Sequence, residues 1–166
     1  LSMQLMQICL MKSNQRAAAA IAAGRLADEI VSISIPQRKG DPLVIANDEG
    51  VRAETTMESL GGLKPAFDKD GTITAANASQ LSDGGSAVVM MSERFVKDRG
   101  IKALGQVVSY GMVAGPDNAS LLTQPSRAIL KALNKVGMKV SDINLFELNE
   151  AFATVGIASM ADLGIS

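Results

Sequence analysis

The stretch Leu145–Ala153, LFELNEAFA, places two strongly polar side chains, Asn149 and Glu150, inside an apolar run. Such side chains cost free energy when they are buried unless each has a hydrogen-bonding partner. The segment Asn144–Leu148 predicts a buried strand, and Glu150–Leu163 predicts a helix. Asn149 therefore falls where a strand gives way to a helix, and its side chain either caps the helix or holds a ligand group. Glu150, in the expected first turn, suits the positive end of the helix dipole.

The same order of elements occurs once more upstream of this stretch. Leu104–Tyr110 has the composition of a strand, and Ser126–Val136 carries apolar residues at helical spacing. A strand–helix–strand–helix order predicts right-handed crossovers and an α/β layered fold. In such folds ligands bind beyond the carboxyl ends of the strands, which is where Asn149 is expected to lie.

The sequence predicts further helices and strands outside this repeated order. Thr55 is expected to cap one helical turn, with Glu58 completing a capping box. The other expected elements are a helix over Leu1–Ala23 ended by Gly24, strands over Ile30–Ile35, Leu43–Ile45 and Ser86–Met91, a helix over Glu93–Arg99, and Gly164 as the end of the last helix.

Composition and charge exclude several classes of function. The 166 residues carry a net charge of −1 and only 3% aromatic residues, so we expect neither nucleic acid nor a membrane surface as a partner. One cysteine, Cys9, and no histidine exclude an internal disulfide and a Cys/His zinc site, and we expect no bound metal. The chain has neither an apolar stretch long enough for a bilayer nor a signal peptide pattern, which predicts a cytoplasmic protein. Because position 1 is leucine and the chain stops just after an expected helix, we expect a piece of a longer polypeptide.

A second polar stretch, Thr74–Ser79, combines small residues with hydrogen-bonding side chains. Small residues permit the close approach of a flexible ligand chain, and Asn77 and Ser79 offer an amide and a hydroxyl to an amide group of that chain. The alternative is a polar loop or helix cap that binds nothing. The residues alone leave both interpretations open.

Four motifs occur in order along the chain and together closely resemble the thiolase family, the acetyl-CoA C-acyltransferases. They are GRLADEIVSI at Gly24–Ile33, LKPAFDKDGTIT at Leu63–Thr74, TAANASQLSDGGSAVVMMS at Thr74–Ser92 and NEAFA at Asn149–Ala153. A further stretch, Ser109–Leu133, is similar to thiolases of the acetoacetyl-forming type. The resemblance covers residues 13–166, whereas Leu1–Lys12 departs from it because the charged residues usual in this helix are missing.

The resemblance implies an α/β, thiolase-like layered α-β-α-β-α fold, present in part and with an inserted loop domain. Residues 1–23 would form a helix at the junction of the N-terminal half and the loop domain, and residues 24–76 would form the CoA-binding loop domain. Residues 77–103 would end the N-terminal thiolase half, and residues 104–166 would begin the C-terminal half.

The resemblance also implies CoA-binding residues. Arg52 would lie against the adenine of CoA, and Phe67, Ala75 and Ser79 would line the pantetheine tunnel. Coenzyme A is expected as substrate and product, and no metal or organic cofactor is implied. The expected partners are acyl-CoA molecules and further copies of the chain, in a homodimer or homotetramer.

The implied activity is acyl transfer between acyl-CoAs in lipid metabolism, through a cysteine acyl-enzyme. One thiolate takes the acyl group from an acyl-CoA, a second cysteine removes an α-proton from another acyl-CoA, and the resulting enolate attacks the acyl-enzyme. The outcome would be condensation of acetyl-CoA to acetoacetyl-CoA or, in reverse, thiolysis of a 3-oxoacyl-CoA. Asn149 would hold the water of one oxyanion hole, and Phe152 would wall the acyl pocket.

The reactive cysteines and histidine of thiolases have no counterpart in this sequence. Cys9 lies in an apolar helix outside any match to the nucleophile motif and is interpreted as a core residue. We therefore expect these residues alone to be inactive and to belong to an active enzyme. The alternatives are a non-catalytic thiolase-like protein that binds acyl-CoA or lipid, and an inactive oligomerising fragment.

Overall fold

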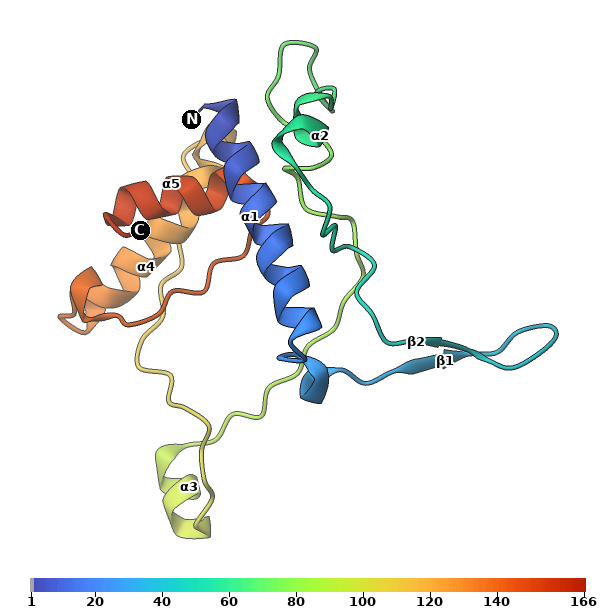
Figure 1. The fold of residues 1–166 in the computed structure, drawn as a ribbon. Helices are drawn as coiled ribbons and strands as arrows, with labels where there is room; N and C mark the ends of the chain where they lie inside the picture. The colour runs from blue at the N-terminus through green and yellow to red at the C-terminus, as the bar shows by residue number, and fades with distance from the viewer. Residues whose placement is uncertain (1) are drawn as a thin grey trace. The chain divides into compact units, whose positions relative to one another are not determined.

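The computed structural model describes residues 2–166 and all of their side chains except those of residues 118 and 119. The chain forms two compact units, unit 1 (Leu1–Gln80) and unit 2 (Leu81–Ser166). Unit 1 holds α1 (Met3–Ala22), η1 (Ala27–Glu29), β1 (Ile33–Ile35), β2 (Leu43–Ile45) and α2 (Met57–Gly61), and unit 2 holds α3 (Glu93–Arg99), η2 (Asn118–Thr123), α4 (Gln124–Lys135), η3 (Val140–Asp142) and α5 (Ala153–Leu163) (Figure 1).

Helix α1 begins where the Ser2 hydroxyl accepts a hydrogen bond from the Leu5 N–H at 3.3 Å. It ends just before Gly24, whose φ of +68° lies in the left-handed region that glycine favours. The predicted helix is therefore confirmed, although Leu1 lies outside the described residues. Within residues 2–166, no helix combines the length and the apolar character that crossing a bilayer requires.

The short helix α2 is capped one residue later than the sequence predicts. The Thr56 hydroxyl accepts from the Ser59 N–H at 3.1 Å, and the Ser59 hydroxyl accepts from the Thr56 N–H at 3.0 Å. Thr55 is buried, and its hydroxyl donates to the Arg52 carbonyl at 2.8 Å. The predicted Thr55–Glu58 capping box is wrong because Thr55 satisfies a loop carbonyl, which leaves the cap to the next threonine.

Strands β1 and β2 form an antiparallel hairpin, with Ile33 opposite Ile45 and Ile35 opposite Leu43. Both predicted strands are confirmed, although β1 is shorter at its start than predicted. Ile33 remains 64% exposed and Leu43 51% exposed. A two-stranded ribbon is only marginally stable without a covering layer, so this hairpin presents apolar side chains to the solvent.

Helices α4 and α5 pack together and form the centre of unit 2 with η2 (Figure 1). Apolar side chains of α5 are buried, with Val155 at 3% and Ile157 at 7% exposure. The fully buried Ser126 hydroxyl of α4 donates to Asp162 Oδ2 of α5 at 2.7 Å. Gly164 closes α5 with a φ of +66°, as predicted. The segment that carries Asn149 leads directly into this helix pair.

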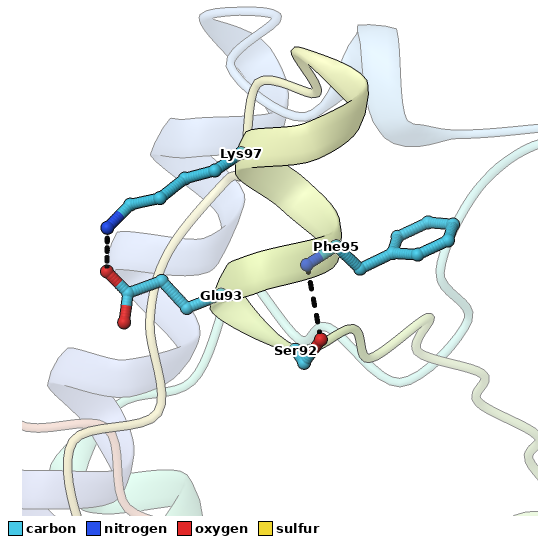
Figure 2. A network of polar contacts seen from close by, with 4 residues as sticks. All are labelled: Ser92, Glu93, Phe95 and Lys97. Atoms are coloured by element: carbon cyan, nitrogen blue, oxygen red, sulfur yellow. Dashed lines mark hydrogen bonds and ion pairs between the residues drawn. The ribbon is translucent and has the colours of Figure 1, made fainter.

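Helix α3 is held by interactions between its own residues (Figure 2). The Ser92 hydroxyl accepts from the Phe95 N–H at 3.2 Å, and Glu93 forms an ion pair with Lys97 one turn later. Because both charged side chains are mostly exposed, the pair stabilises the helix by at most about 1 kcal/mol. The predicted helix is confirmed with the same bounds.

The three strands predicted after residue 80 are not formed. Ser86–Met91, Leu104–Tyr110 and Asn144–Leu148 run without regular secondary structure. A strand needs a neighbour for its N–H and C=O groups, and no strand pairs with these segments in the described part of the chain. Their apolar side chains are largely exposed, with Val89 at 84% and Val108 at 64%. These predictions are wrong for this chain because composition indicates where a strand fits but supplies no partner.

The end of one of these segments lies along α4 instead. The Ser109 hydroxyl donates to the Ala132 carbonyl at 2.7 Å. At Gly111 an added Cβ would lie 2.1 Å from the Ala128 carbonyl oxygen, so only glycine permits this close approach to the helix. The segment is therefore held by a helix surface and not by a sheet.

Candidate functional site

Asn149 precedes the cap of α5. The helix begins at Ala153 with Phe152 as its N-cap, so neither Asn149 nor Glu150 lies in the first turn. The Asn149 carbonyl accepts from the Ala151 N–H at 3.0 Å, and Asn149 is exposed. The capping interpretation of Asn149 and the predicted place of Glu150 are wrong, because this tight turn delays the start of the helix.

The N-cap residue of α5 makes no side-chain capping hydrogen bond. Phe152 has an extended backbone, with φ of −142° and ψ of 151°, and its side chain offers no acceptor. The first N–H groups of a helix carry the positive end of its dipole, which favours negative charge nearby. Asn149 and Phe152 therefore lie beside a terminus that suits a developing oxyanion, although their catalytic roles stay predictions.

The backbone of Arg52 is fixed on both sides within unit 1. Asn14 of α1 accepts from the Arg52 N–H through Oδ1 at 2.9 Å. Thr55 donates to the Arg52 carbonyl from its N–H at 3.2 Å and from its hydroxyl at 2.8 Å. The residue itself is exposed. An anchored backbone with an exposed planar guanidinium suits stacking on a base, but the adenine contact stays a prediction.

A narrow loop carries Phe67 and Ala75 in unit 1. Pro65 and Thr74 form an isolated antiparallel bridge, next to which the Ala66 N–H donates to the Ile73 carbonyl at 2.8 Å. Phe67 and Ala75 lie on opposite sides of this bridge, each within a residue or two of it. Phe67 is 79% exposed, so its ring offers apolar surface to a ligand chain.

The polar stretch Thr74–Ser79 folds onto itself through Asn77. Asn77 Oδ1 accepts from the Thr74 N–H at 2.9 Å, and Asn77 Nδ2 donates to the Thr72 carbonyl at 2.9 Å. Asn77 is only 5% exposed, whereas Ser79 is exposed. Of the two side chains suggested as ligand contacts, Asn77 is occupied by the loop's own backbone and Ser79 faces outward.

Gln80 connects this stretch to the loop of Arg52. Gln80 Nε2 donates a long hydrogen bond of 3.5 Å to the Gly50 carbonyl. A Cβ added at Gly50 would lie 2.5 Å from that nitrogen, so glycine permits the two loops to approach. The residues expected to bind CoA therefore all lie in unit 1, and Gln80 connects the end of the Thr74–Ser79 stretch to the loop of Arg52: they are Arg52, Phe67, Ala75 and Ser79.

The predicted site residues are divided between the two units. Asn149 and Phe152 belong to unit 2, and the four CoA-binding candidates belong to unit 1. That both groups line one cavity stays a prediction. An open groove along α4 contains none of them; it is lined by Val113, Arg127, Leu130, Lys131, Asn134 and Lys135.

Two residues of α1 hold the loop of Arg52 and were not predicted from the sequence. Gln15 Nε2 donates to the Thr55 carbonyl at 3.5 Å, beside the bond between Asn14 and Arg52. Both amide side chains thus connect α1 to the loop that carries Arg52. The signal available was two adjacent amide residues in a helix otherwise rich in methionine, leucine and alanine, because polar groups placed there usually have partners.

Two family models match the chain. Residues 9–94 match the description "Thiolase, N-terminal domain" and residues 101–166 match "Thiolase, C-terminal domain". The chain belongs to the thiolase family. The two thiolase matches leave only a short interval between residues 94 and 101, and the four-part division of the chain stays a prediction.

Curated members of the thiolase family are similar over nearly the whole chain. A protein of Mycolicibacterium smegmatis named "Probable acetyl-CoA acetyltransferase" is 53% identical over 93% of this chain and 39% of its own length. An acetyl-CoA acetyltransferase of Thiocystis violacea is 47% identical over 92% of this chain and 38% of its own length. The chain therefore spans about two fifths of the length of these relatives.

Solved thiolase structures share the fold. The Bacillus anthracis acetyl-CoA acetyltransferase matches all of this chain with a TM-score of 0.89 and 40% identity, over 42% of its own length. Human mitochondrial 3-ketoacyl-CoA thiolase in complex with CoA matches all of this chain with a TM-score of 0.86 and 37% identity, over 40% of its own length. The chain thus has part of the α/β thiolase fold, which confirms the fold class predicted from the motifs.

Proposed function

We propose that this chain is part of an acyltransferase that moves acyl groups between acyl-CoAs, by condensing acetyl-CoA to acetoacetyl-CoA or by cleaving a 3-oxoacyl-CoA with CoA. The observation that carries the proposal is 53% identity, over 93% of the chain, to a protein named as an acetyl-CoA acetyltransferase. The solved relative in complex with CoA supports CoA as the shared carrier.

In this proposal the loops of unit 1 bind CoA. Arg52 stacks its guanidinium on the adenine, while Phe67, Ala75 and Ser79 line the pantetheine chain. The exposed ring of Phe67 and the exposed Ser79 support this assignment. No metal or organic cofactor is required, because the thioester itself makes the acyl group reactive.

Asn149 serves the chemical step. Its amide donates to a water molecule that in turn donates to the thioester oxygen as negative charge develops there, and Phe152 walls the acyl pocket. The structure supports this role because Phe152, and not Asn149, is the N-cap of α5, and Asn149 lies just before it. The nucleophilic thiolate and the second cysteine are supplied by the rest of the thiolase, since Cys9 is this chain's only cysteine.

The test uses the full-length protein that contains this chain. The protein should cleave acetoacetyl-CoA with CoA, and Asn149→Ala should lower kcat by about 10²–10³ while the Kd for CoA changes little, because one oxyanion donor is lost. Absence of thiolysis and condensation in a folded protein that still binds CoA would favour the non-catalytic alternative. Equal loss of kcat and of CoA affinity would contradict the role of Asn149.

The proposal extends to the setting and the assembly. We infer a cytoplasmic enzyme of lipid metabolism that forms a homodimer or homotetramer, with the isolated residues 1–166 inactive. Exposed apolar side chains on β1 and β2 support contact with further protein. Light scattering of the full-length protein measures the oligomer, and a monomer at micromolar concentration would contradict this part of the proposal.

A further inference from the structure

We propose that Asn77 is a positioning residue for CoA: its side chain shapes the loop so that Ala75 and Ser79 meet the pantetheine chain, without touching the ligand itself. This inference rests on the proposed function. It assigns to Asn77 a role different from that of Ser79, although the two residues carry equally suitable polar groups in the sequence.

The Asn77 side chain closes the loop at two places. Its oxygen accepts from the Thr74 N–H at 2.9 Å, and its nitrogen donates to the Thr72 carbonyl at 2.9 Å. The Asn77 N–H adds a bond of 3.2 Å to the Thr74 carbonyl. Ala75 lies inside this closed turn and Ser79 lies two residues after it. The direction of both residues therefore depends on the bonds that Asn77 makes.

The burial of Asn77 argues against direct recognition of the ligand by this side chain. Its amide oxygen and its amide nitrogen each make one hydrogen bond to the backbone of its own loop. Asn77 is 5% exposed, whereas Ala75 and Ser79 are exposed. A ligand amide would have to open the turn to reach the buried Asn77 side chain, while Ser79 is accessible without any such cost.

Loss of the side chain should affect binding more than chemistry. Thr74 is 6% exposed, so its N–H would lose its partner in a buried position and the turn would rearrange. Ala75 and Ser79 would then no longer be held against the pantetheine. Asn149, which serves the chemical step in the proposed function, is carried by the other unit.

The first experiment measures thiolysis of acetoacetyl-CoA by the full-length protein. Asn77→Ala should raise the KM for CoA about tenfold and change kcat by less than about twofold. An unchanged KM, or a loss confined to kcat, would overturn the positioning role and leave the proposed function standing. A wild-type protein that neither binds nor turns over CoA thioesters would overturn the proposed function itself.

A double-mutant cycle with Ser79→Ala separates positioning from direct contact. If Asn77 acts through its neighbour, Asn77→Ala should raise KM by less than about threefold when Ser79 is already alanine. The full tenfold increase in both backgrounds would show that Asn77 does not act through Ser79 and would overturn the proposal.

Asn77→Asp provides the conservative variant, and it is decisive where the alanine variant does not fold. The introduced carboxyl keeps the acceptor for the Thr74 N–H but, when ionised, faces the Thr72 carbonyl with a second acceptor. Its protonated form can donate to that carbonyl as the amide does. Affinity for CoA should therefore fall at about pH 8 and recover, relative to the wild type, at about pH 5.5, because burial raises the pKa of such a carboxyl. A ratio to wild type that does not change with pH would contradict the proposed bonds.

Discussion

Two segments that follow each other closely in the sequence, Thr72–Ala78 and Leu81–Met91, behave in opposite ways. In Thr72–Ala78 the polar groups find partners within a few residues, and Thr74 and Asn77 are buried. In Leu81–Met91 the backbone has no regular structure, and apolar side chains such as Val89 are exposed. Only the first segment contains hydrogen-bonding partners for its own polar groups.

The difference shows how far local chemistry can determine structure. A side-chain amide can close a turn over two or three residues, because donor and acceptor are tethered close together. A strand needs N–H and C=O groups from a second strand, which comes from elsewhere in the chain or from another chain. The polar turn is therefore formed by hydrogen bonds between its own residues. The apolar segment has no strand to pair with in the described part of the chain.

Amide hydrogen exchange should show the largest contrast between the two parts. In this chain the amides of Thr74 and Asn77, which donate hydrogen bonds at 2.9 Å and 3.2 Å, should exchange at least about a hundredfold more slowly than those of Val88 and Val89. Exchange measured by NMR checks this directly. Equal exchange rates in the two segments would contradict the claim that only the first is held by its own hydrogen bonds.

Substitution of Gly111 tests the contact between the segment around Ser109–Gly111 and helix α4. Gly111→Ala should lower the free energy of unfolding by about 1–3 kcal/mol, because its Cβ would lie 2.1 Å from the Ala128 carbonyl oxygen. Gly105→Ala is the matched control, since a Cβ there meets nothing within 4 Å. Denaturant unfolding of this chain provides the measurement, and equal stability of the two variants would contradict the close approach to α4.

Substitution of Val89 should have the smallest effect. Val89→Thr should change the stability of this chain by less than about 0.5 kcal/mol, because the side chain is 84% exposed. In the full-length protein the same change should be more costly, since a strand partner would bury the residue. Thermal unfolding of both proteins checks the difference, and an identical response would mean that the segment stays unpartnered in the whole protein.

The helices were predictable because their signals are local. Glu93–Arg99 has its serine cap, its i,i+4 ion pair and its terminal glycine within one short stretch, and the predicted bounds are the observed ones. The start of α5 is an exception, since the tight turn between Asn149 and Ala151 delays the helix. Three predicted strands after residue 80 did not form, and the sequence could not show this. Composition indicates that a segment can form a strand, but not whether a second strand is present to pair with it.

The candidate site, like the fold, could be predicted from the sequence only in part. Motif resemblance indicated Arg52, Ser79 and Asn149, and the structure adds which backbone bonds hold their loops. Single-sequence patterns could not separate Asn77 from Ser79, because burial decides which polar group is available to a ligand. The support that Asn14 gives to the Arg52 loop spans 38 positions in the sequence, a separation that local patterns do not reveal.

A structure of the full-length protein with CoA bound tests the central claim most directly. The account predicts the pantetheine chain in van der Waals contact with Ala75 and Ser79. It also predicts the Asn149 amide within hydrogen-bonding distance of a water molecule at the sulfur end of CoA, where the thioester oxygen of a substrate would lie. CoA bound away from these loops, or Asn149 packed in apolar surroundings far from the pantetheine, would contradict it.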